Sequence, residues 1–245
     1  MRNILAIGRR EFFAYFGSPV AYIAIAVFLV LLGVTFFFKI PFLLPKEDFF
    51  EAKEATLRPL FEWMVFLFTI FLPAISMRLL AEERKMGTLE ILLTMPVTET
   101  EVVVGKLLGA IGFLAIATGL TLAYPLMVGL LGDPDIGPLA GGYFGVLLVG
   151  SSYLAVGLLA SSWTRSQIVA FIAAIVICAV FTFIDRLPEA LGLHSMEAFN
   201  MMSFNHHFRS IARGVIDTRD MVFFFSVIVG SVVLASYSLE ARKWR

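Results

Sequence analysis

The residues of this chain that could take part in phosphate chemistry are the pair Gly105-Lys106. A phosphate-binding loop has the pattern G-x-x-x-x-G-K-[ST], because backbone N–H groups and the lysine surround the phosphates while the last residue's hydroxyl binds magnesium. Here Thr100 stands where the first glycine is required, and Leu107 replaces the hydroxyl residue. The sequence therefore predicts no ATP hydrolysis, no catalytic residue and no bound cofactor in this chain.

Histidines are the candidate metal ligands. His206 and His207 are adjacent, and His194 lies nearby. Adjacent residues of a helix point to different sides, and no carboxylate or thiol completes a set of zinc ligands around them. We therefore predict no metal site.

Charged residues inside membrane spans are costly and usually functional. No Asp, Glu, Lys or Arg lies near the middle of an apolar run. Glu62 and Asp185 lie close to the ends of their runs. The runs contain weakly polar residues, which are more typical of helix–helix hydrogen bonds than of substrate contacts: Thr69, Ser76, Thr118, Thr121, Tyr124, Ser151, Ser152 and Thr182. An ion pump is disfavoured, whereas an apolar, Phe-rich interior permits lipid-like cargo or no cargo at all.

The elements that position these residues are predicted to be membrane helices. Of 245 residues, 59% are hydrophobic and 16% charged, against about 45–50% and about 25% in soluble domains. Apolar runs of roughly 20 residues, the length that spans a bilayer, occur at about 19–38, 60–80, 107–131, 139–161, 168–184 and 221–239. The runs do not alternate as barrel strands do. The fold class is therefore all-α integral membrane, with a six-helix transmembrane domain over 19–245.

Lysine and arginine counts predict the orientation, because cytoplasmic loops carry more of them. With the N-terminus inside, eleven fall on the cytoplasmic side and eight outside. The clearest positive flanks are Arg9-Arg10 before the first run and residues 242–245 after the last. Both termini are therefore predicted to be cytoplasmic. The formal net charge of zero gives no electrostatic argument for a nucleic-acid partner.

Residues 1–18 predict an amphipathic helix that lies in the membrane interface. The helical projection separates apolar residues from polar ones: Ile4, Leu5, Phe12, Tyr15 and Phe16 on one side, and Arg2, Asn3, Arg9 and Arg10 on the other. Pro19 suits the first turn of a new helix, which starts the first span. A plain positively charged anchor for that span is the alternative. An export signal is disfavoured, since the apolar run is too long.

The segment between the second and third runs predicts helical pieces separated by breaks. The second run continues into a charged turn at residues 81–85, and Gly87 can adopt the left-handed conformation that closes a helix. Thr98, with Glu101 three residues later, has the capping-box spacing that begins the third helix.

Between these breaks, Thr88 can cap a short apolar helix over 89–95 that Pro96 ends. Such a short helix is not stable alone. It packs either against its own spans, as an elbow, or in a groove of another protein.

Two stretches resemble a known family. Residues 79–97, LLAEERKMGTLEILLTMPV, are similar to the cytoplasmic loop of the type-2 membrane subunits of ABC exporters, in which this pattern forms the coupling helix that contacts the ATPase. Residues 207–220, HFRSIARGVIDTRD, resemble the segment before the last span of gliding-motility-associated ABC permeases. The resemblance covers nearly the whole chain.

The resemblance implies a permease subunit that is not itself an enzyme, driven by a separate ABC ATPase that binds ATP and magnesium. It implies a second copy or a related permease as partner, an accessory membrane or periplasmic protein as a further candidate, and surrounding lipid of the bacterial inner membrane. It assigns nine residues to the ATPase-coupling loop: Glu82, Glu83, Gly87, Thr88, Leu89, Glu90, Leu92, Leu93 and Pro96. The leucines would form the docking face, and the carboxylates would set its orientation against basic residues of the motor.

Two other functions stay open. The chain could be a non-transporting membrane scaffold or mechanotransmitter that holds or extracts a partner protein, in line with the gliding-motility resemblance. It could also be a secondary transporter without a motor. The absence of midplane charges and of a visible inverted repeat speaks against that last function.

Overall fold

The computed structural model describes residues 2–37, 57–88, 97–132, 135–190, 197–215 and 217–243. Every regular element in these ranges is a helix, and six helical stretches are long and apolar enough to cross a membrane. The all-α membrane fold class with six spans is therefore confirmed. In chain order the elements are α1 (Arg2–Phe16), α2 (Pro19–Phe37), α3 (Arg58–Ser76), α4 (Arg78–Met86), α6 (Glu99–Leu120), α7 (Ala123–Leu131), α8 (Ile136–Trp163), α9 (Gln167–Phe183), η1 (Ile184–Arg186), α10 (Leu187–Ala190), α11 (Glu197–Met202), α12 (Phe204–Ile211) and α13 (Thr218–Lys243).

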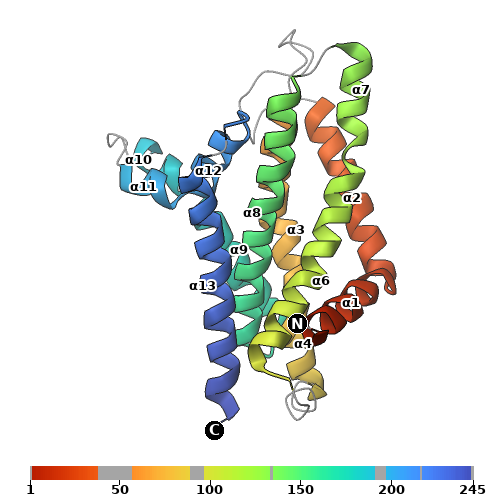
Figure 1. Ribbon diagram of the computed structural model, residues 1–245, viewed down its shortest axis with the longest axis vertical. Coiled ribbons are helices and arrows are strands. Elements are labelled where there is room, and N and C mark those ends of the chain that lie inside the picture. Colours follow the sequence, from red (N-terminus) through yellow and green to blue (C-terminus); the bar gives the residue numbers. More distant parts are fainter. Residues whose placement is uncertain are drawn as a thin grey trace.

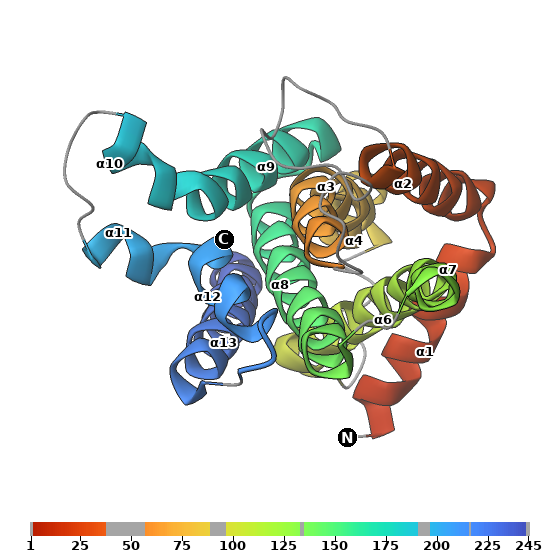
Figure 2. The ribbon, with the colours of Figure 1, turned by 90° about the horizontal axis from the view of Figure 1, so that it is seen from above.

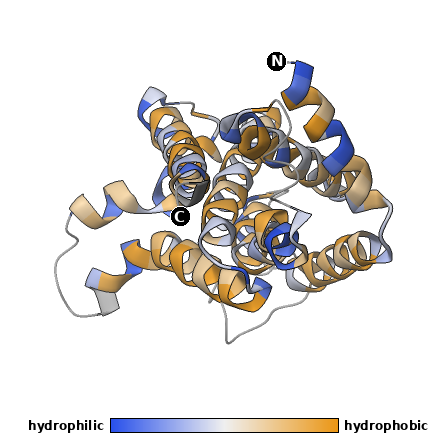
Figure 3. Ribbon diagram, turned by 90° about the horizontal axis from the view of Figure 1, so that it is seen from below, coloured by the Kyte–Doolittle hydropathy of each residue, from blue (hydrophilic) through white to orange (hydrophobic). Residues whose placement is uncertain are grey.

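Helix α8 occupies the middle of the bundle, with α3, α6, α9 and α13 packed around it (Figures 1 and 2). Small residues of α8 bring these neighbours close: Gly157 meets Ser76 of α3, and Gly150 meets Leu114 of α6. The outer helices α2, α9 and α13 keep much of their apolar surface exposed, as expected of helices that face lipid. Figure 3 shows these hydrophobic outer faces from below.

Helix α6 begins at Glu99, directly after the predicted cap Thr98 and before the start of the apolar run at 107. The capping box is confirmed, because Thr98 Oγ1 accepts the Glu101 N–H at 3.2 Å and Glu101 Oε2 accepts the Thr98 N–H at 3.2 Å. The span is interrupted between α6 and α7, at Thr121 and Leu122. Pro125 explains the position of this break, since it offers no N–H to the carbonyl of Thr121, four residues earlier.

A second interruption, at Met77, separates α3 from α4 where the sequence predicts one continuous helix. The hydroxyl of Ser161, from α8, accepts the N–H groups of Leu80 at 3.1 Å and Ala81 at 2.8 Å, and donates to the Met77 carbonyl at 3.0 Å. In an uninterrupted helix Ala81 N–H would bond Met77 O directly. The hydroxyl is therefore inserted into the helical hydrogen-bond ladder, which explains the break.

We expect Ser161→Ala to lower the free energy of unfolding by about 1–2 kcal/mol, because two buried helix N–H groups lose their acceptor. Ser162→Ala is the matched control, since Ser162 is equally buried but donates to the Leu159 carbonyl of its own helix. Unfolding can be followed by alkylation of Cys178, the single cysteine of the chain, which is buried. An equal loss in both variants would contradict the bridging role.

The two termini lie toward one end of the bundle, which we call the terminal end, and α7 and α10–α12 lie at the other (Figure 1). At that other end His207 Nδ1 lies 2.6 Å from Asp220 Oδ1 of α13, and Nε2 lies 3.0 Å from the Met201 carbonyl of α11. One carboxylate, that of Asp220, therefore lies beside His207, and a single carboxylate does not complete a set of zinc ligands. Within the described ranges, which leave out His194, no three His, Cys, Asp or Glu side chains gather as metal ligands would.

Candidate functional site

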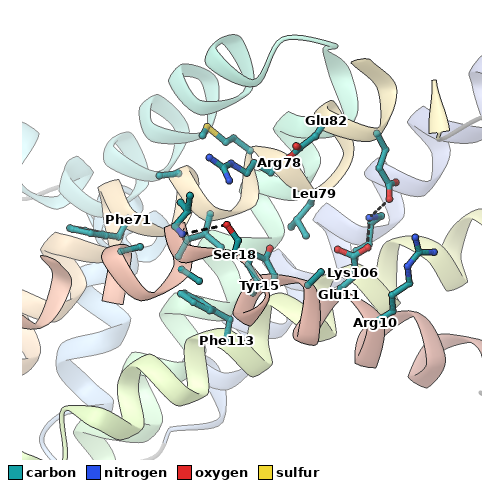
Figure 4. Close-up of a pocket in the computed structure, with 18 of the residues that line it drawn as sticks. Arg10, Glu11, Tyr15, Ser18, Phe71, Arg78, Leu79, Glu82, Lys106 and Phe113 are labelled. Carbon is teal, nitrogen blue, oxygen red and sulfur yellow. Dashed lines mark hydrogen bonds and ion pairs between the residues drawn. The ribbon is translucent and has the colours of Figure 1, made fainter. Parts of the chain in front are cut away.

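A buried ammonium group joins three helices at the terminal end. The Nζ atom of Lys106, on α6, lies 2.8 Å from Glu11 Oε1 of α1 and 2.8 Å from Glu83 Oε1 of α4 (Figure 4). The side chain of Lys106 is 2% exposed, and those of Glu11 and Glu83 are 20% and 24% exposed. A buried charge is stable only when it is paired and hydrogen-bonded. Lys106 meets this condition, because both carboxylates bond its ammonium group. We call Lys106, Glu11 and Glu83 the Lys106 cluster.

The Lys106 cluster holds two carboxylates and one ammonium, so it carries one negative charge in excess. One carboxylate oxygen, Glu83 Oε2, is buried and accepts no hydrogen bond from any described residue. Beside the cluster lies Tyr15 of α1. Burial raises the pKa of its phenol above the ordinary value and Glu11 raises it further, while Arg78 lowers it. The phenol is therefore neutral at physiological pH.

Glycines place α1 directly against α6. A Cβ atom added to Gly105 would lie 2.8 Å from Ile7, and one added to Gly109 would lie 2.7 Å from the Cβ of Glu11. On the α1 side, a Cβ added to Gly8 would lie 3.2 Å from the Gly105 carbonyl. The two backbones are thus close enough for Glu11 to reach Lys106.

Part of the predicted apolar side of α1 packs on α6, since Tyr15 and Phe16 contact Phe113. The predicted apolar side includes Leu5, which is 68% exposed, whereas the buried residue of this helix is Gly8. The helix is still amphipathic, and Figure 3 shows hydrophilic and hydrophobic bands along it. Glycines, which weigh little in a helical projection, determine where the backbones of α1 and α6 approach most closely.

The structure describes four of the nine residues that the sequence assigns to the coupling loop. Glu83 belongs to the Lys106 cluster, and Glu82 lines the pocket beside it. Gly87 ends α4 in the left-handed conformation that the sequence predicts, with φ 73°. The exposed Thr88 donates its hydroxyl to the Glu83 carbonyl at 3.3 Å. The other five, Leu89, Glu90, Leu92, Leu93 and Pro96, lie outside the described residues.

Sequence reasoning missed Lys106 and Glu11, because it considered Lys106 only as part of an incomplete phosphate-binding motif and gave Glu11 no role. Two signals could have found them. Lys106 is preceded by Val102-Val103-Val104 and followed by a span, so its charge has apolar residues on both sides. Gly105 and Gly109 form the small-xxx-small spacing through which membrane helices approach closely.

These features define a multi-pass helical membrane protein whose first helix, α1, is held against the bundle at the terminal end. The chain belongs to the ABC-2 transporter family, because the family model described as "ABC-2 family transporter protein" matches residues 18–244. A comparison with curated proteins gives no match. Membership makes this chain a permease component of an ABC transporter, a transmembrane subunit that is not itself catalytic, and implies an ABC ATPase as partner.

Proposed function

We propose that this chain transmits the ATP-driven movements of a separate ATPase into the membrane, with α4 and the segment after it as the point of contact. The observation that carries the proposal is the Lys106 cluster. Lys106, on α6, forms ion pairs with Glu83 of α4 and Glu11 of α1. Helix α4 leads directly into the segment after Gly87, which we call the coupling segment. A push on α4 would therefore reach two further helices through ion pairs.

Two features support α4 as a unit that transmits force. The Ser161 hydroxyl holds its first turn to α8, and the left-handed Gly87 ends it cleanly before the coupling segment. Ion pairs with a buried member resist separation, because the low surrounding dielectric strengthens their attraction. Movement of the segment after Gly87 would thus displace α1 and α6 together with α4.

The proposed complex follows the family resemblance. ATP and magnesium bind the ATPase, and Leu89, Leu92 and Leu93 form the docking face of this chain. The terminal end faces the cytoplasm, and a second copy or a related permease completes the complex in the bacterial inner membrane. The stretch over 207–220 supports a place among the gliding-motility-associated permeases, where the conformational work could act on export or on an accessory partner.

Co-purification with its partner ABC ATPase tests the proposal. We expect the wild type and the control Thr94→Asp, which adds one carboxylate beside the docking leucines, to retain the ATPase. The variant Leu92→Asp/Leu93→Asp should lose it, because two carboxylates in an apolar groove cost several kcal/mol. Retention of the ATPase by the double variant, or its absence from the wild type, would contradict the docking role of this segment.

A further inference from the structure

A pocket of about 590 Å³ opens beside the Lys106 cluster, between α1, α2, α3, α4 and α6. Its volume falls within the range of about 300–1,000 Å³ that small-molecule sites occupy. Exposed lining residues show where it reaches the surface: Arg10, Ala14, Val20, Arg78 and Met86. The opening therefore lies along the corner between α1 and α2, and along α4 from its first residue, Arg78, to its last, Met86.

The lining changes from apolar to charged along the pocket (Figure 4). Phe71 and Phe113 lie at one end, where a smaller apolar cavity between α2, α3 and α6 continues the space. Arg10 and the Lys106 cluster lie at the other end. This gradient follows the boundary between membrane and water, since α1 is an amphipathic helix and α2 and α3 are spans.

Several charged groups of the pocket are available to a ligand. Within the described residues, the guanidinium groups of Arg10 and Arg78 and the carboxylate of Glu82 make no ion pair. The Lys106 cluster adds one negative charge in excess and the orphan oxygen Glu83 Oε2. The six charged lining residues sum to zero, with three positive and three negative. A ligand that complements them carries both signs.

We propose that this pocket binds one zwitterionic aminophospholipid from the leaflet at the terminal end. The lipid phosphate would accept hydrogen bonds from Arg10 and Arg78, which suit anionic oxygens. The lipid ammonium would donate to Glu82 and Glu83, and the first acyl carbons would pack on Phe71. The bound lipid would join α1 to α2 and α3 on the side that the Lys106 cluster does not reach.

Native mass spectrometry of the purified full-length chain in detergent tests the site, with palmitoyl-oleoyl phosphatidylethanolamine and phosphatidylglycerol as probes. We expect one phosphatidylethanolamine per chain, retained at about tenfold lower concentration than phosphatidylglycerol, because only the former offers an ammonium to the carboxylates. Soluble phosphoethanolamine should not compete at these concentrations, since it lacks the acyl chains. No ATPase is present, so this result is independent of motor docking.

Three variants localise the binding. Ala74→Trp and the milder Ala24→Leu reduce the pocket, and Arg10→Gln/Arg78→Gln removes its free cations; each should reduce phosphatidylethanolamine retention by about tenfold or more. Ala26→Trp is the matched control, since Ala26 is exposed on α2 but does not line the pocket. Slow alkylation of Cys178 shows that a variant is folded. Equal retention by the arginine variant and the wild type would overturn the proposal, as would preference for phosphatidylglycerol or equal competition by phosphoethanolamine.

Discussion

Replacing Lys106 with methionine is expected to lower the free energy of unfolding by about 2–3 kcal/mol. The substitution keeps the length of the side chain but leaves Glu11 and Glu83 facing each other without a cation. Removing one partner of a fully buried ion pair costs about 3–5 kcal/mol. Because the side chains of the two glutamates are 20% and 24% exposed, we expect a loss at or just below the lower end of that range. Denaturant-dependent alkylation of Cys178 measures it.

A neutral triple variant separates charge from packing in this experiment. Lys106→Met/Glu11→Gln/Glu83→Gln leaves no unpaired charge, so it should recover most of the lost stability. In complex with the ATPase, however, both the single and the triple variant should lose ATP-driven conformational change, because neither keeps the ion pairs between α4, α1 and α6. A single variant that is as stable as the wild type would show that the cluster does not hold these helices together.

The second large effect concerns the contact between α1 and α6. We expect Gly109→Ala to destabilise the chain by about 1–3 kcal/mol. The new Cβ would lie 2.7 Å from the Cβ of Glu11, 3.0 Å from the Gly8 carbonyl oxygen and 3.1 Å from the Phe12 nitrogen. Two of these three atoms belong to the backbone, so α1 as a whole has to move away. Thermal unfolding, again reported by Cys178, measures the loss.

Gly119→Ala is the control on the same helix. A Cβ at Gly119 would meet nothing within 4 Å, so the substitution should be neutral or stabilise α6 by up to about 1 kcal/mol through helix propensity. Gly109→Ala should thus lower the free energy of unfolding, whereas Gly119→Ala should leave it unchanged or raise it. Equal effects would mean that the close approach of α1 and α6 does not limit stability.

The sequence predicted the features that depend on neighbouring residues. Span composition located the six helices, and cap chemistry located the capping box at Thr98 and the left-handed Gly87, because each signal lies within a few residues or one apolar run. The apolar runs alone mark the helix starts and ends less accurately than the caps do. Helix α6 begins before its apolar run, since a charge such as Lys106 can be helical and buried once it is paired.

The sequence could not predict the contacts that build the candidate site. Glu11 and Lys106 are 95 residues apart, and Ser161 lies 81 residues from Leu80. No local pattern joins such pairs, because they meet only after the bundle has packed. The docking role of Leu89, Leu92 and Leu93 rests on the family resemblance and stays a prediction, since these residues lie outside the described ranges.

The central position of α8 limits where a molecule could cross the bilayer. The most apolar stretch of α8 is 83% buried, against 33% for α2, 22% for the span containing α9 and 28% for α13. In the part of the chain that the structure describes, the axis of the bundle is therefore occupied by a helix and has no room for a pore. A translocation route has to run along the outside of the subunit, and α2, α9 and α13 supply the exposed walls that a second subunit or lipid would complete.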